Sequence, residues 1–195
     1  MEKKVMTQTM CSAMIEHCYQ KIQSALDQRK EADWFAKAYE IVYKMMTEAL
    51  GIPPQFYTIG GSAALIGYGM HLGRIPHDID VVVNKAIFQD VVEIISNSYM
   101  FTPARGSESS MAWSYPVEVK YKDDKKYIVD ILGHDDPRKF KQYKYGDVYL
   151  QDLQQIIDVK CAWNRRKDKE DIDKIMQYMI KEESETQIED PTLPF

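Results

Sequence analysis

Short apolar runs rich in β-branched residues lie between helical patterns of different lengths, and this arrangement limits the fold more than any other feature of the sequence. The clearest run is Asp78–Val83, with the sequence Asp-Ile-Asp-Val-Val-Val, which is typical of a strand. Strands and helices that do not alternate strictly favour an α+β fold, with a small mixed β-sheet and flanking helices. Strands are predicted at residues 55–59, 78–83, 111–120, 126–132 and 148–150.

Helical patterns precede and follow these strands. Two of them, over residues 8–29 and from Asp33 to Ala49, predict an N-terminal helical pair, with Asp33 as the N-cap of the second helix. Gly51 and the prolines that follow it end this pair. Further helices are predicted at residues 63–68, 85–99, 152–163 and 167–181. We therefore expect an N-terminal helical extension at 1–52, a core at 53–150, C-terminal helices packed on the core at 151–182 and an acidic tail at 183–195.

The composition excludes several classes of protein. The chain has 195 residues, of which 45% are hydrophobic, so it can bury a core and is not a disordered chain. No apolar run is long enough to span a membrane, and the N-terminus lacks the features of a signal peptide, so we expect a cytoplasmic protein. Three cysteines are too few for a disulfide framework or a zinc site. The net charge of -5 argues against a protein that coats nucleic acid.

Two aspartates lie two positions apart in the run at 78–83. Side chains alternate between the faces of a strand, so Asp78 and Asp80 point to one face while Ile79 and Val81 point to the core. Neighbouring carboxylates repel one another, and a divalent cation relieves that repulsion. Oxygen ligands of this kind suit Mg²⁺ or Mn²⁺.

A third carboxylate, Asp130, stands alone in the apolar run at 126–132. If this strand pairs with the strand of Asp78 and Asp80, three carboxylates meet on one face of the sheet. Such a group suits one or two metal ions, and a two-metal site catalyses phosphoryl transfer. The alternative is that Asp130 is a strand-end residue that forms a salt bridge with a nearby lysine.

The segment Gly60-Gly61-Ser62 lies between a predicted strand and a predicted helix. Glycines allow a sharp turn and a close approach of the backbone to a ligand. The backbone N–H groups and the Ser62 hydroxyl can then donate to phosphate. The segment is neither a P-loop nor a Rossmann fingerprint, because the residues that define those motifs do not follow it.

These motifs follow one another in the order Ile-Gly-Gly-Ser, Arg74, Asp-Ile-Asp and a later Asp. This order resembles the DNA polymerase β-type nucleotidyltransferase superfamily, most closely its minimal and AbiEii-like branches. The resemblance extends over roughly Gln55 to Tyr178, and it implies that the mixed sheet is a nucleotidyltransferase core. Pro76 departs from the family pattern, which often has Thr or Ser two residues before the first Asp. The helical Lys, Arg, Asp and Asp of the family match Lys160, Arg165, Asp168 and Asp171.

The resemblance implies a Mg²⁺-dependent enzyme that transfers a nucleoside monophosphate from an NTP to an acceptor and releases pyrophosphate. Asp78 and Asp80 would bind the metal, and Asp130 would bind a second metal or act as general base. The segment Gly60–Ser62 would hold the phosphates, while Lys160 and Arg74 would neutralise negative charge. Arg165 and Asp168 would contact the nucleotide, or would form an ion pair that only organises the last two helices.

The acceptor stays open between tRNA, as for a toxin-like enzyme, a protein and a small molecule such as an antibiotic. The lysine-rich segment from Lys120 to Lys144 could hold an RNA end. The N-terminal helices could bind a protein partner or a second copy of the chain. A catalytically silent nucleotidyltransferase-fold module is the alternative function. A metal phosphohydrolase built on His77-Asp78 and His134-Asp135 is disfavoured, because Asp78 begins a strand rather than lying on a helix.

Overall fold

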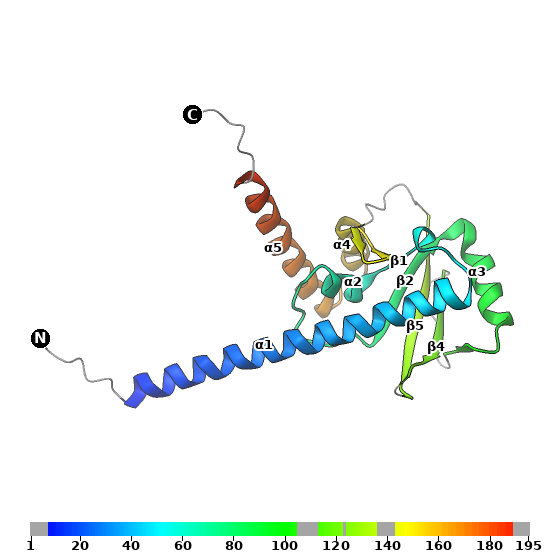
Figure 1. Ribbon diagram of the computed structural model, residues 1–195. Coiled ribbons are helices and arrows are strands. Elements are labelled where there is room, and N and C mark those ends of the chain that lie inside the picture. Colours follow the sequence, from blue (N-terminus) through cyan, green and yellow to red (C-terminus); the bar gives the residue numbers. More distant parts are fainter. Residues whose placement is uncertain (1–7, 105–112, 123, 136–142, 189–195) are drawn as a thin grey trace, which may run out of the picture.

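The computed structural model describes residues 8–104, 113–122, 124–135 and 143–188 (Figure 1). Within these residues the strands form one seven-stranded sheet in the order β3-β4-β5-β2-β1-β7-β6. The strands β2 and β5 pair in parallel, as do β1 and β7, and the other neighbours are antiparallel. The sheet is therefore mixed, and the predicted α+β class is confirmed. The strands are β1 (Tyr57–Ile59), β2 (Asp78–Asn84), β3 (Thr102–Pro103), β4 (Ser114–Lys120), β5 (Lys126–His134), β6 (Tyr143–Tyr145) and β7 (Val148–Leu150).

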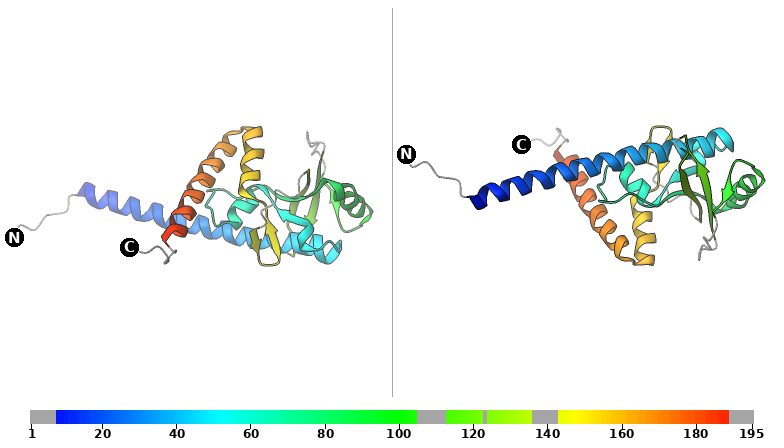
Figure 2. Two further views of the ribbon diagram at one scale, coloured as in Figure 1. Left: turned by 90° about the horizontal axis from the view of Figure 1, so that it is seen from above. Right: turned by 90° about the horizontal axis from the view of Figure 1, so that it is seen from below.

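Helices lie on both sides of this sheet. Figure 2 shows the long helix α1 on one side and helix α4, with the start of α5, on the other. The helices α2 and α3 pack against β2, and α3 also packs against β5. The helices are α1 (Gln8–Tyr43), which continues as a π-helical turn over Lys44–Ala49, α2 (Gly61–Gly67), α3 (Lys85–Asn97), α4 (Leu153–Trp163) and α5 (Arg166–Ile188).

The predicted N-terminal helical pair is wrong, because α1 is one continuous helix from Gln8 to Tyr43. Asp33, expected to cap a second helix, lies in its interior. The residues around the expected break are Arg29-Lys30-Glu31-Ala32, which contain neither Gly nor Pro and are strong helix formers. Gly51, with a φ of +68°, lies two residues beyond the π-helical turn, as expected for the end of this segment.

The two halves of α1 have different surroundings. Its second half contributes Phe35, Ala38, Ile41 and Val42 to the same buried cluster as residues of β1, β2, β4, β5 and β7. Its first half projects beyond the body of the protein, and the apolar side chains Tyr19, Ile22 and Leu26 are exposed there (Figure 1). A boundary at residue 52 stays a prediction, although the core includes residues on both sides of it.

Other differences from the predicted elements are small. The first strand is shorter than predicted, because residues 54–56 form a 3₁₀ turn. The short strands β3 and β6 were not predicted. Helix α5 continues to Ile188, so the predicted acidic tail is helical at its start, and residues 189–195 lie outside the described residues. None of the described helices is both long and apolar enough to cross a membrane.

Candidate active site

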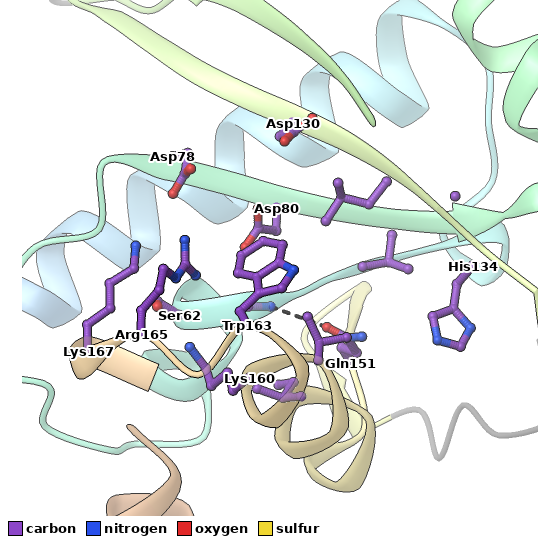
Figure 3. A pocket seen from close by; sticks show the side chains of 16 residues that line it. Ser62, Asp78, Asp80, Asp130, His134, Gln151, Lys160, Trp163, Arg165 and Lys167 are labelled. Atoms are coloured by element: carbon purple, nitrogen blue, oxygen red, sulfur yellow. Dashed lines mark hydrogen bonds between the residues drawn. The ribbon is translucent and has the colours of Figure 1, made fainter. Parts of the chain in front are cut away.

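A cavity of about 170 Å³ lies between the sheet and α4 (Figure 3). The strands β2 and β5 form one wall, helix α4 forms the opposite wall, and the start of α2 closes one end. The residues that line the cavity are Gly61, Ser62, Asp78, Asp80, Val82, Asp130, Leu132, Gly133, His134, Gln151, Ile156, Val159, Lys160, Trp163, Arg165 and Lys167.

Three of the predicted acidic residues line this cavity together. Ile79 and Val81 are buried in the core, so strand alternation turns Asp78 and Asp80 to the cavity face. The condition for their meeting is met, because β2 pairs with β5 and the register places Asp130 directly beside Asp80. Residues that are paired across a parallel ladder share a face of the sheet. The strand pairing therefore explains why the three carboxylates enter the same cavity.

The carboxylates alter one another's ionisation. Burial raises the pKa of Asp80 to about 7, and the negative charges of Asp78 and Asp130 add to the shift. Lys160 and Lys167 act in the opposite direction on the same carboxyl group. Burial also raises the pKa of Asp130, although the Ser114 hydroxyl, which donates to Asp130 Oδ1 at 2.6 Å, partly offsets this. The site therefore concentrates negative charge beyond what its lysines neutralise.

The glycine turn is packed directly against Asp80. Gly61 has a φ of +54°, and a Cβ atom at this position would lie 1.8 Å from Asp80 Oδ2. A Cβ atom on Gly60 would lie 2.7 Å from Gln151 Oε1. The Gly60 N–H donates to the Asp80 carbonyl at 2.8 Å, and the Gly61 N–H donates to Gln151 Oε1 at 3.3 Å. Only glycine fits at position 61, because both the backbone conformation and the adjacent carboxylate exclude a side chain.

A second polar network contacts Ser62, next to the glycine turn, and is centred on the fully buried Asp171. Arg74 donates two hydrogen bonds to its carboxylate, at 2.8 and 2.6 Å, and Lys160 donates one at 2.7 Å. Burial alone would raise the pKa of Asp171, but the hydrogen bonds from Arg74 and Lys160 hold it below its usual value. Arg74 Nη2 also donates to Ser62 Oγ at 3.2 Å. Arg74, predicted to neutralise negative charge on the nucleotide, is thus directed at Asp171 and Ser62 and does not line the cavity.

Arg165 and Asp168 form the ion pair that was the alternative to nucleotide contact. Arg165 Nε lies 2.6 Å from Asp168 Oδ2, and Asp168 is fully buried. Lys160 Nζ lies 3.6 Å from the other carboxylate oxygen of Asp168. Burial opposes ionisation of Asp168, but the hydrogen bonds from Arg165 keep its pKa below the usual value. Of the three residues, Lys160 and Arg165 line the cavity, whereas Asp168 does not line it and forms ion pairs with both of them.

One buried acid near the site was not predicted. Glu31 on α1 is 3% exposed and accepts hydrogen bonds from the Leu72 and Arg74 N–H groups, each at 3.0 Å. His71 Nδ1 lies 3.0 Å from the same carboxylate, so this histidine is engaged away from the cavity. Glu31 therefore fastens the loop that carries Arg74. Its sequence signal is weak, since it is only an acid four positions before the buried Phe35.

The donor set suits a hard divalent cation by its chemistry, because the three carboxylates offer only oxygen ligands and repel one another. Among the described residues, however, no three His, Cys, Asp or Glu side chains are grouped closely enough to hold a metal ion. The carboxylates would therefore have to turn toward one another to share an ion. Asp130 would exchange its hydrogen bond with Ser114 for such a contact.

No protein-family model matches the chain, and no curated protein matches it. Solved structures that it resembles include a provisionally assigned nucleotidyltransferase from H. pylori, with 20% identity, 64% of this chain and 56% of that chain covered, and a TM-score of 0.40. A provisionally assigned nucleotidyltransferase from Thermotoga maritima is 17% identical, and the match covers 71% of this chain and 92% of that chain with a TM-score of 0.42. The nucleotidyltransferase toxin MenT4 from Mycobacterium tuberculosis is 15% identical, and the match covers 76% of this chain and 60% of that chain with a TM-score of 0.46.

The match thus spans just over half of the H. pylori chain. These likenesses are too distant to assign a function. The function is therefore inferred from the residues of the cavity.

Proposed function

We propose that this protein is a nucleotidyltransferase that uses Mg²⁺ or Mn²⁺ to transfer a nucleoside monophosphate from an NTP to an acceptor. The observation that carries the proposal is the group of Asp78, Asp80 and Asp130 on paired strands, with the Gly60-Gly61 turn packed against Asp80. Burial first, and then the neighbouring carboxylates, raise the pKa values of Asp80 and Asp130, whereas a structural salt bridge would lower them. The group also agrees with the order of motifs along the chain.

Each cavity residue has a separate role in the proposed reaction. The acceptor oxygen forms a bond to the α-phosphorus of the NTP, the bond to pyrophosphate breaks, and Asp130 accepts the acceptor's proton. Asp78 and Asp80, with Asp130, would hold the metal, which would supply charge neutralisation at the phosphates. Lys160 and Lys167 add positive charge near Asp80, where the leaving pyrophosphate develops negative charge. The segment Gly60–Ser62 would lie along the phosphates.

Ser62 and Arg74 act together in this proposal. Arg74 donates to Ser62 Oγ, and both residues contact Asp171. We therefore assign Arg74 the task of holding Ser62 and the glycine turn in place. Asp168 has the corresponding task for Arg165.

The test is nucleotide binding followed by label transfer. The protein is mixed with MgCl₂ and each NTP, and thermal unfolding is recorded; binding to the folded state raises the melting temperature. It is then incubated with each α-³²P-labelled NTP and with cellular RNA, protein or small-molecule extract. We expect a thermal shift that depends on Mg²⁺ and a labelled product, both lost in Asp78→Asn and Asp80→Asn.

Asp90→Asn is the matched control, because Asp90 is an exposed aspartate on α3. A thermal shift without label transfer to any acceptor would favour the catalytically silent module. A chain that neither binds metal nucleotides nor labels any acceptor would refute the proposal.

The acceptor class remains part of this test. The lysine-rich segment offers less free charge than its sequence suggests, because Lys120, Lys122 and Lys126 pair with Asp124, Glu40 and Glu118. Residues 136–142 of the same segment lie outside the described residues. The label-transfer experiment with RNA, protein and small molecules decides among the acceptors.

A further inference from the structure

The cavity is lined by both charged and apolar side chains, and these two groups of residues are called its charged part and its apolar part. The carboxylates, Lys160 and Lys167 form the charged part beside the glycine turn. The apolar part is formed by Val82, Leu132, Ile156, Val159 and Trp163. An NTP has the same division, since its triphosphate is charged and its base presents flat, weakly polar faces.

Trp163 supplies an aromatic surface to the apolar part. It is the last residue of α4, and 43% of its surface is exposed. Figure 3 shows its indole ring projecting from the end of α4 into the cavity. An exposed tryptophan on a cavity wall is available for stacking, whereas a tryptophan in the core is not.

The ring is held in place by its neighbours. Asn164 takes a left-handed conformation with a φ of +53°, and its N–H donates to the Lys160 carbonyl at 2.9 Å, which ends α4. The guanidinium carbon of Arg165 lies 4.1 Å from the centre of the indole ring. The Arg165 guanidinium in turn donates two hydrogen bonds to the buried Asp168, at 2.6 and 3.1 Å. A buried carboxylate therefore fixes a cation on one face of the tryptophan.

We propose that Trp163, supported by Arg165, is a stacking platform for the base of the bound NTP. The inference rests on the proposed function, and it assigns the apolar part of the cavity to the base. Trp163 stacks on the base, and Arg165 is a positioning residue that orients the ring. The Arg165–Asp168–Lys160 series of contacts connects this platform to the charged part of the cavity. This continuity favours the base of the NTP over a base of an RNA acceptor.

The experiment compares two ligands that differ in the base. Binding of Mg·NTP and of Mg·tripolyphosphate, which has no base, is measured for the unaltered protein, Trp163→Ala and Trp163→Phe. Loss of base stacking on an aromatic side chain weakens binding by about 5- to 150-fold. We expect a loss of this size for NTP binding to Trp163→Ala, with unchanged tripolyphosphate binding. Trp163→Phe keeps an aromatic ring and should retain most of the NTP affinity.

Two further readouts separate stacking from a structural role. Nucleotide-dependent quenching of tryptophan fluorescence should disappear in Trp163→Phe, although Trp34 and Trp113 remain. Arg165→Lys, which keeps the positive charge but loses the flat guanidinium, should weaken NTP binding without changing tripolyphosphate binding. Thermal unfolding without ligand should be similar for the unaltered protein and Trp163→Ala, because the side chain is exposed.

Three results would overturn the platform. Equal losses of NTP and tripolyphosphate in Trp163→Ala would mean that the side chain supports the site as a whole. Unchanged NTP affinity with a raised KM for the acceptor would assign the platform to the acceptor instead. If the unaltered protein binds neither Mg·NTP nor Mg·tripolyphosphate, the proposed function is refuted together with the platform. The other two results would refute the platform alone.

Discussion

At the scale of single residues, the site is defined by carboxylates that share one cavity at a cost in stability. The pKa of Asp80 is about 7 in the folded protein, compared with 3.8 for an ordinary aspartate. The folded state therefore binds a proton more tightly than the unfolded state does. Stability from this group is complete at low pH and is lost as the pH rises through about 7.

We therefore expect Asp80→Asn to melt at a higher temperature than the unaltered protein at pH 8 without metal. The difference should shrink toward pH 5, where the native carboxyl group is protonated. Each kcal/mol corresponds to roughly 2–4 °C for a chain of this size. Mg²⁺ should raise the melting temperature of the unaltered protein at pH 8 but not that of Asp80→Asn. A lower melting temperature for Asp80→Asn at pH 8 would contradict the repulsion among the carboxylates.

Gly61→Ala tests the contact between the turn and Asp80. The substitution combines a positive φ with a Cβ atom 1.8 Å from Asp80 Oδ2. Gly69→Ala is the matched control, since Gly69 has a φ of +85° and nothing within 4 Å of a Cβ atom. The control should lose about 1 kcal/mol from backbone strain, and Gly61→Ala should lose more in denaturant unfolding. Equal losses would show that Asp80 moves aside without cost.

At the scale of elements, the strands were more predictable than the contacts between distant helices and loops. Alternation along residues 78–83 predicts which side chains are buried, and the structure agrees at Ile79 and Val81. The pairing of β2 with β5 was a condition in the sequence argument, because a strand pattern does not specify its neighbour. Glu31 could not be predicted, since its partners Leu72 and Arg74 lie about forty positions away. Trp163 was missed because no motif includes it.

Glu31→Gln tests the connection between α1 and the loop of Arg74. Glutamine retains one acceptor oxygen and presents an NH₂ group to a backbone N–H, so one buried donor loses its partner. The expected loss is roughly 1–3 kcal/mol of stability. Hydrogen exchange should quicken at the Leu72 and Arg74 amides. Glu16→Gln, on the exposed part of the same helix, should change neither. Unchanged exchange in Glu31→Gln would mean that the loop is held by other contacts.

At the scale of the whole molecule, the two halves of α1 make separate contributions to stability. The described side chains between Glu16 and Lys30 are mostly exposed, whereas Glu31 and Phe35 are buried. The sequence pattern predicted helix across both halves but placed a break between them. Helical periodicity does not reveal whether a face meets a partner, so the change from exposed to buried required the structure.

A pair of shortened chains tests this division. A chain that begins at residue 29 should unfold at nearly the same temperature as the full chain, because it keeps Glu31 and Phe35. A chain that begins at residue 37 should unfold at a clearly lower temperature, because it loses both buried side chains. Calorimetry of the two chains and the full-length protein provides the comparison. A large drop for the first chain would show that the projecting half of α1 stabilises the fold.

The hydrogen bonds of Glu31 also determine which residues have to be included if the cavity is grafted onto another protein. The recognisable motifs start near Gln55, and an engineer guided by them would graft residues 55–178 onto another scaffold. Such a graft would carry the aspartates and the glycine turn, but it would leave behind the carboxylate that anchors Leu72 and Arg74. The smallest portable version of this cavity therefore has to bring part of α1 with it.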